Sequence, residues 1–147
     1  MVIRTPGCKF TLANFFRSQL YSTMATLKIG MEILEKENVA IDSLTGHGGL
    51  FKTPGVGQRY MAAACNTSIT CMETAGEGGP YGMALLAAYC GEKTPDESLE
   101  SYLNNRVFSQ AKCTVMAPIK ADIVGFNAYM EKYKALLRVE QAAVENL

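Results

Sequence analysis

The sequence lacks an excess of charge of either sign. Its 14 basic residues balance 14 acidic ones, and no long run of one sign occurs. Binding to a nucleic-acid backbone or to an anionic membrane surface depends on such an excess. The chain also lacks an apolar run long enough to cross a bilayer, and its N-terminus shows no secretory signal. We therefore expect a soluble protein without a nucleic-acid or membrane partner.

Metal-ligating and disulfide-forming patterns are also scarce. His47 is the only histidine, and no Cys, Asp or Glu lies around it at ligand spacing, so no metal site is predicted. No Ser or Cys partner stands beside it, which favours a turn-lining histidine over a catalytic one. The cysteines form a scattered, odd-numbered set: Cys8, Cys65, Cys71, Cys90 and Cys113. Such usage favours a reducing compartment, and we predict a cytoplasmic protein.

Two long helices are predicted near the ends of the chain. The 147 residues, 48% of them hydrophobic, suffice for one domain with a core. Residues 1–11 carry little periodicity and are interpreted as a loose lead-in. Apolar side chains then recur every three to four positions over residues 12–38 and again over residues 121–147, the pattern of amphipathic helices.

Shorter elements fill the middle of the chain. We expect a strand over residues 39–45, a helix over 54–65 with Thr53 as its N-cap, a second strand over 67–72 and a helix from Pro80. The two strands of such a unit pair in parallel through a right-handed crossover. A short helix over residues 96–108 and an extended segment over 113–118 follow. The predicted fold class is therefore α/β, with short parallel strands and flanking helices.

A glycine cluster follows each predicted strand. Gly46, Gly48 and Gly49 end the first strand, and a second cluster follows the second strand at residues 76–79. Parallel strands place both clusters at one sheet edge, where open α/β sheets bind ligands, so we expect a crevice with exposed backbone. Either cluster alone is explained equally well by a tight turn into a helix.

Each charged side chain near the glycine clusters has two possible roles. Lys52 lies where it would reach an anionic ligand, and a solvated loop lysine is at least as good an interpretation. Glu73 and Glu77 are placed to orient a sugar hydroxyl, yet acidic residues before a helix are equally explained by the helix dipole. Cys65 and Cys71 flank the second strand and are interpreted as small core residues.

The two glycine segments resemble the C-terminal part of the FGGY carbohydrate kinases. The similar features are the turn GHGGLFKTPGVGQ, a Q-x-x-A-A-like helix after it, and the segment from Glu73 through Ala88 with its E-x-A-G start and small-residue helix. The resemblance extends over roughly residues 12–147, and its tail is similar to that of xylulokinase- and ribulokinase-like members. It implies part of an actin-like ATPase domain, of the ribonuclease H-like class.

This resemblance implies a nucleotide site at the glycine turns. In the family the first turn holds the adenosine side of ATP, and the phosphoryl group passes to a sugar such as a ketopentose with Mg²⁺ present. His47 replaces a glycine of the commonest form of that turn. Carried over to this sequence, the resemblance implies that the nucleotide-binding residues are Gly46, Gly48, Gly49, Phe51, Lys52, Gly78 and Gly79.

The resemblance also shows what this sequence does not contain. Family members are several times longer, and their N-terminal domain carries the sugar site, a phosphate motif and the aspartate that acts as base. Asp42, Asp96 and Asp122 stand at the starts of predicted elements, where capping or solvation accounts for them. No catalytic residue is therefore predicted, and we expect the missing N-terminal kinase domain, or a partner chain, to supply the rest.

Without that part of the kinase, an exposed apolar face is expected on the helix that begins at Leu12. Two further interpretations stay open. In the first, the chain is a nucleotide-binding module without catalysis. In the second, the glycine turns bind no ligand and the long helices form a homo-oligomer.

Overall fold

The computed structural model describes residues 1–146; Leu147, the last residue of the predicted domain, lies outside the described residues. The chain divides into two compact units. The first comprises Met1–Asp42, Tyr60–Thr67 and the chain from Pro118, and the second comprises Ser43–Arg59 and Ser68–Ala117. Helix α2 (Val56–Cys65) contributes residues to both units.

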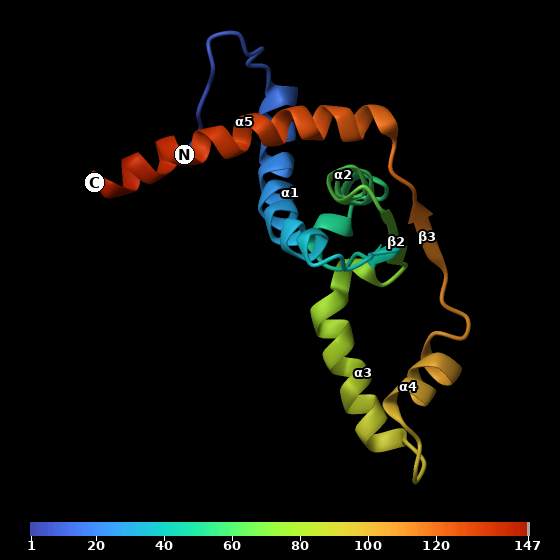
Figure 1. Cartoon of the computed structure of the whole chain (residues 1–147). Coiled ribbons are helices and arrows are strands. Elements are labelled where there is room, and N and C mark those ends of the chain that lie inside the picture. The colour runs from blue at the N-terminus through green and yellow to red at the C-terminus, as the bar shows by residue number, and fades with distance from the viewer. Residues whose placement is uncertain (147) are drawn as a thin grey trace. The chain divides into compact units, whose positions relative to one another are not determined.

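The first unit is built on two long helices, as predicted. Helix α1 (Leu12–Lys36) and helix α5 (Lys120–Glu145) lie close to the predicted ranges. Thr11 caps α1 by accepting a hydrogen bond from the Asn14 backbone N–H at 3.2 Å. Residues 1–11 form no helix or strand, and α1 crosses α5 in Figure 1.

Aromatic packing holds this unit together. The ring of Tyr21 on α1 makes edge-to-face contacts with Tyr60, Phe126 and Tyr129, at centroid distances of 5.2 to 5.4 Å. Phe126 is fully buried, and Met24 and Met130 are also buried core residues of this unit. Such pairs stabilise a fold beyond the area they bury.

The outer side of α1 keeps apolar side chains exposed. Phe16 is 60% exposed and Ile33 is 62% exposed, whereas Met24 on the same helix is 3% exposed. An ion pair between Lys134 and Glu32, at 2.7 Å, joins α5 to α1. The helix is therefore covered on one face, and its other face presents the apolar surface that the sequence predicts.

The second unit holds a three-stranded sheet of order β1–β2–β3. Strand β1 (Ser43–Thr45) pairs in parallel with β2 (Ser68–Met72), which confirms the predicted pairing. Strand β3 (Cys113–Met116) pairs antiparallel with β2, with Cys71 opposite Thr114. The expectation of parallel strands alone is therefore wrong: the extended segment at 113–118 returns along β2 and makes the sheet mixed.

The first strand and the second helix are shorter than predicted. Asn38 has φ of 55°, and the backbone N–H of Val39 bonds to Leu34 O, so residues 37–39 close the end of α1 and do not begin a strand. Gly55 has φ of 75°, which interrupts helical geometry after Pro54 and moves the start of α2 to Val56. Thr53 is therefore not the N-cap of α2.

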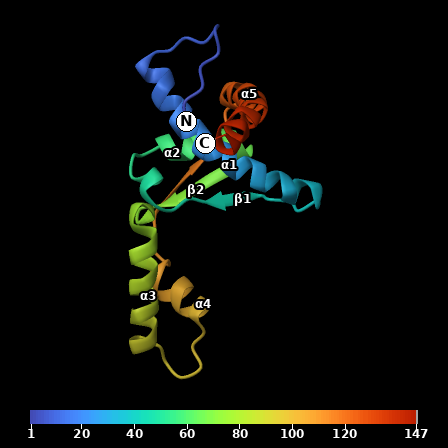
Figure 2. The same cartoon turned by 90° about the vertical axis from the view of Figure 1, so that its left-hand side faces the viewer.

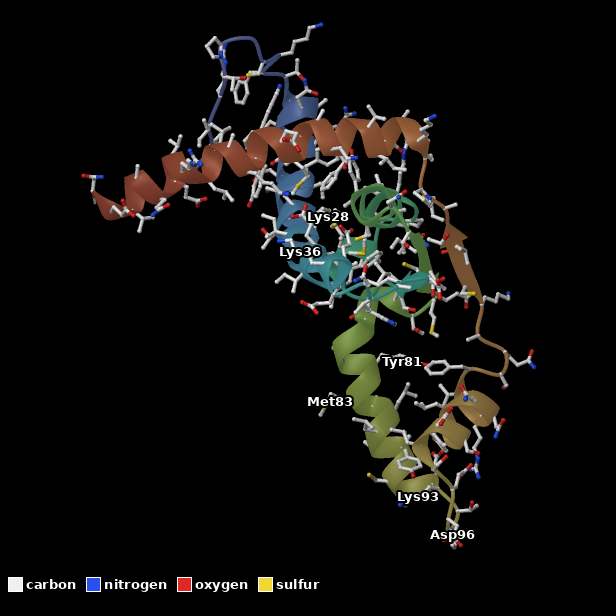
Figure 3. All side chains as sticks on the ribbon, in the orientation of Figure 1. Lys28, Lys36, Tyr81, Met83, Lys93 and Asp96 are labelled. Carbon is white, nitrogen blue, oxygen red and sulfur yellow. The ribbon has the colours of Figure 1, made fainter. Side chains whose placement is uncertain are left out.

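Helix α3 (Gly78–Glu92) begins two residues before Pro80 and runs away from the sheet (Figures 1 and 2). Its sequence is apolar nearly throughout, yet no residue of it is fully buried. In Figure 3, Tyr81 and Met83 point to opposite sides of the helix, and Met83 is 69% exposed. Helix α3 is therefore apolar in sequence without having a buried face.

The helix predicted at 96–108 is two short elements. Asp96 has φ of 69°, and Ser98 caps α4 (Leu99–Tyr102) by accepting from the Ser101 N–H at 3.1 Å. A π-helical turn, η3 (Leu103–Val107), follows directly. The positive φ at Asp96 is incompatible with a helix start there, so the helix begins three residues later, at Leu99.

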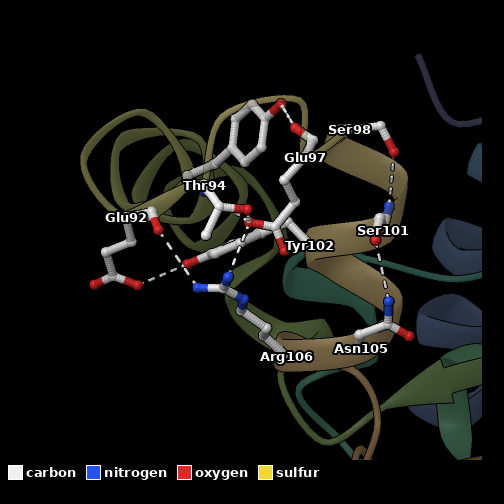
Figure 4. Close-up of polar contacts among 9 residues, drawn as sticks. Glu92, Thr94, Glu97, Ser98, Ser101, Tyr102, Asn105 and Arg106 are labelled. Atoms are coloured by element: carbon white, nitrogen blue, oxygen red, sulfur yellow. Dashed lines mark hydrogen bonds and ion pairs between the residues drawn. The ribbon is translucent and has the colours of Figure 1, made fainter.

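Polar contacts fasten α4 and η3 to the end of α3 (Figure 4). Tyr102 is buried and donates its phenol hydrogen to Glu92 Oε2 at 3.0 Å, which raises the pKa of the phenol. Arg106 forms an ion pair with Glu97 at 3.0 Å, and Tyr89 donates to Glu97 O at 2.7 Å. Hydrogen bonds, an ion pair and a contact between the rings of Tyr89 and Tyr102 therefore join α4 and η3 to the end of α3.

Candidate functional site

The first glycine cluster forms an irregular turn, residues 46–52, after β1. Gly48 has φ of 101° and ψ of −175°, a backbone conformation that essentially only glycine adopts. Its N–H donates to Ala75 O at 2.6 Å, and the short helix η1 (Gly49–Phe51) follows. Because this N–H is already bonded within the protein, it is not a donor for a ligand in this conformation.

The second cluster is helical. A 3₁₀ turn, η2 (Ala75–Glu77), leads without a break into α3, so Gly78 and Gly79 are the first residues of that helix. We call residues 73–79 the second turn and residues 46–52 the first turn. The two turns contact each other through the bond from Gly48 N–H to Ala75 O, at the sheet edge where both were predicted.

The crevice predicted between the turns is not open. A Cβ atom on Gly46 would overlap the ring of Phe51 and lie 3.0 Å from the Cys71 Sγ. A Cβ on Gly78 would lie 2.8 Å from the Cβ of His47. These glycines therefore make room for neighbouring side chains, whereas no atom lies within 4 Å of a Cβ built on Gly48, Gly49 or Gly79.

A cavity of about 890 Å³ lies beside the turns instead. Of the seven predicted nucleotide-binding residues, Phe51 and Lys52 line it. The rest of its wall comes from the residues before α2 and its first turn, the end of β2, the second turn, and β3 with the residue before it: Pro54, Gly55, Gln58, Cys71, Met72, Glu73, Thr74, Ala75, Gly76, Glu77, Lys112, Cys113, Thr114 and Met116. Its volume lies in the range of small-molecule sites, about 300 to 1,000 Å³.

Four charged side chains line the cavity with no net charge. Lys52 and Lys112 are balanced by Glu73 and Glu77. Lys52 Nζ lies 2.7 Å from Glu77 Oε1, which links the first turn to the second. The backbone of Glu73 donates to Lys112 O at 3.2 Å, so the second turn is also tied to the segment before β3.

Gln58 on α2 holds the wall of the cavity in place. It is 6% exposed, and its Nε2 donates to Ile69 O on β2 at 3.2 Å and to Thr114 O on β3 at 3.0 Å. Its Oε1 accepts from the Thr114 hydroxyl at 3.2 Å. One side chain thus satisfies groups on both strands, as buried polar groups require.

Burial affects the cysteine thiol that lies nearest the turns. Burial raises the pKa of Cys71, and a backbone hydrogen bond from Gly46 offsets part of that rise. Desolvation likewise raises the pKa of Cys65, which lies in the first unit. Both cysteines are buried, as predicted, and these raised pKa values disfavour the thiolate form that nucleophilic catalysis needs.

Residues 1–146 contain neither a cluster of metal-ligating side chains nor a membrane-spanning helix. No three His, Cys, Asp or Glu side chains in this range lie together as metal ligands would. No helix in the described part of the chain is both long and apolar enough to span a membrane.

Sequence reasoning missed the contribution of β3 and of Lys112. The segment at 113–118 was recognised as extended, but nothing in its own residues indicates pairing with β2. Gln58 stands inside the motif that carries the family resemblance, although no role was assigned to it. A polar residue on the apolar side of a short helix was the signal that would have identified it as buried and bonded.

Residues 2–90 match the family described as FGGY family of carbohydrate kinases, C-terminal domain. The match includes more than half of the 147 residues, and the chain therefore belongs to the FGGY family of carbohydrate kinases. Membership implies the actin-like ATPase fold that the resemblance predicted. Neither the curated proteins nor the solved structures yielded a match.

The matched range contains both turns, but it ends before β3. It begins at residue 2 and so includes most of the segment interpreted as a lead-in. Residues 112–116, which complete the cavity, lie beyond it. The turns are thus family features, whereas the far wall of the cavity is not covered by the match.

Proposed function

We propose that this chain is the C-terminal nucleotide-binding portion of an ATP-dependent sugar kinase. The complete enzyme transfers the γ-phosphoryl group of ATP to a hydroxyl of a ketopentose such as xylulose or ribulose. The observation that carries the proposal is the 890 Å³ cavity that both turns of the family's C-terminal domain line. The free cysteines agree with the cytoplasmic location that we propose for it.

The adenine nucleotide occupies the cavity in this proposal. Phe51 offers an aromatic surface for the base, and Lys52 offers a cation for a phosphate. Gly48, Gly49 and Gly79 do not line the cavity, but a Cβ built on any of them meets no side chain within 4 Å, so we infer that they would admit a part of the nucleotide that extends beyond the cavity. Gly46 and Gly78 contribute indirectly, through the packing that shapes the turns.

The described residues do not offer a resident site for Mg²⁺. Glu73 and Glu77 are the carboxylates that line the cavity, and no three-ligand cluster exists in residues 1–146. We assign no metal-dependent step to these side chains. In the complete enzyme, Mg²⁺ would accompany the nucleotide phosphates, as is common in kinase sites.

Catalysis requires parts that we do not find in this chain. The family resemblance implies that an N-terminal kinase domain supplies the sugar site and the aspartate base, and that domain closure excludes water. We propose that this domain lies elsewhere on the same polypeptide or on a partner chain. This chain then binds nucleotide and positions it, without turning over sugar alone.

Calorimetric titration of the 147-residue chain with ADP tests the proposal. Saturable heat is the expected result. The variant Met83→Ala changes an exposed side chain of α3 outside the cavity, and it should bind ADP with the same affinity as the wild type. No heat at millimolar ADP would contradict nucleotide binding and favour the alternative of helix-mediated self-association. A coupled kinase assay over a panel of pentoses should be flat, and measurable turnover would show that a base is present here.

A further inference from the structure

Lys52 and Glu77 connect the two turns across the rim of the cavity. Lys52 ends the first turn, and Glu77 belongs to the second turn, immediately before α3. Their charged groups lie 2.7 Å apart, with side chains 59% and 65% exposed. A solvated ion pair of this kind contributes little stability, so it is broken at little cost.

The stem of Lys52 reaches Glu77 by crossing the second turn at Gly76. A Cβ on Gly76 would lie 3.0 Å from Lys52 Cγ and 3.6 Å from Lys52 Cε. The missing side chain at Gly76 therefore leaves the path along which the lysine extends. Packing and charge both direct Lys52 toward the carboxylate.

An anionic ligand that enters the cavity meets a balanced set of charges. The two lysines that line the cavity face two carboxylates, and Lys52 is already paired with one of them. A phosphate group that bonds to Lys52 therefore competes with Glu77 for the same ammonium group. The carboxylate also repels the phosphate while it remains near.

We propose that Glu77 competes with phosphate for Lys52, so that this ion pair sets the affinity of the site for phosphorylated ligands. The inference rests on the proposed nucleotide function and adds the residue that opposes phosphate binding. In the unliganded protein Glu77 holds the ammonium group over Gly76. When a phosphate binds, the ammonium group transfers its hydrogen bond to the phosphate and Glu77 turns to solvent.

Glu77→Gln tests this most simply, with ADP and adenosine as probes. The variant should bind ADP roughly two- to fivefold tighter, the size expected for one exposed ion pair. Adenosine, which has no phosphate, should bind with unchanged affinity. Both titrations use the full chain at fixed ionic strength, and the thermal unfolding of each variant confirms that it is folded.

Two further variants separate competition from a general charge effect. Lys52→Gln should weaken ADP binding, and in that background Glu77→Gln should give a smaller gain than in the wild type, because no ammonium group remains to be released. Glu73→Gln removes the same charge from the same cavity, but Glu73 forms no ion pair among residues 1–146. Its effect should therefore add to that of Lys52→Gln.

The outcomes distinguish the two proposals. If the wild type binds ADP but Glu77→Gln binds it no tighter, or gains equally with Lys52 absent, the competition is overturned and the nucleotide site stands. Equal tightening of adenosine would also overturn it. A wild type that binds neither probe overturns the nucleotide site, and the competition with it.

Discussion

The two turns begin from the same signal, a run of glycines after a strand, and fold differently. The first turn is irregular: Gly48 has φ of 101°, and Phe51 and His47 fold back over Gly46 and Gly78. The second turn is helical from Ala75 onward and continues into α3. The difference shows that the glycines of one cluster are needed for different reasons. One position needs glycine for its backbone conformation, another for close packing, and a third leaves space for a ligand.

The largest loss of stability is expected on changing Gln58, because its side chain bonds to both β2 and β3. Gln58→Leu removes the hydrogen bonds to Ile69 O, Thr114 O and the Thr114 hydroxyl. At about 1 kcal/mol for each bond, the free energy of unfolding should fall by about 3 kcal/mol. Urea denaturation measures this change.

Gln141→Leu is the matched control for that substitution. Gln141 is exposed on α5, and within residues 1–146 its side chain bonds only to Glu145. The free energy of unfolding should therefore fall by less than about 0.5 kcal/mol. Equal losses for Gln58 and Gln141 would show that the buried bridge does not stabilise the sheet.

The next effect separates the turns directly. Gly48→Ala places a side chain at φ of 101° and should cost about 2 kcal/mol of unfolding free energy through backbone strain. Open space surrounds the position, so the cost would come from conformation and not from a clash. A Gly48→Ala chain as stable as the wild type in urea would mean that the first turn does not need its glycine.

Gly79→Ala should have the opposite sign. Gly79 is the second residue of α3, and it has open space around it. Alanine at this position therefore lowers the entropy of the unfolded chain without causing strain. We expect a gain of about 0.5 kcal/mol in the same urea measurement. A loss at this position would show that the second turn constrains its glycines as the first one does.

A smaller and kinetic difference concerns the thiols near the turns. Cys71 is buried with a raised pKa, whereas Cys113 is exposed at the neighbouring strand. Iodoacetamide should modify Cys71 at least about tenfold more slowly than Cys113, since the thiolate is the reactive form. Because the pKa is raised, labelling of Cys71 should increase only at a higher pH than in the urea-unfolded chain. Peptide mapping that finds equal rates would show that Cys71 is not buried as the structure has it.

Local patterns predicted the helices and the parallel pair well. The period of apolar residues located α1 and α5, and the crossover rule paired β1 with β2. The ends of the inner elements were less predictable, because they depend on positive φ values at Asn38, Gly55 and Asp96. Glycine adopts positive φ routinely, whereas asparagine and aspartate do so only occasionally, so the sequence does not mark the other two positions.

The candidate site was only partly visible in the sequence. The turns and Lys52 follow from local motifs, but β3 reaches the cavity from about forty residues downstream, and no local pattern encodes that antiparallel pairing. Likewise, the packing of Phe51 on Gly46 and of His47 on Gly78 depends on contacts between separate segments. The sequence therefore marked where a site lies without showing which side of the turns is open.

Protection of Cys113 by ADP tests most directly whether nucleotide occupies this cavity. Cys113 lines the cavity and is exposed, and Cys90, exposed on α3 and outside it, is the internal reference in the same sample. With saturating ADP, iodoacetamide labelling of Cys113 should slow several-fold while labelling of Cys90 does not change. If ADP binds by calorimetry and leaves the Cys113 rate unchanged, the nucleotide lies elsewhere and the assignment of the cavity is wrong.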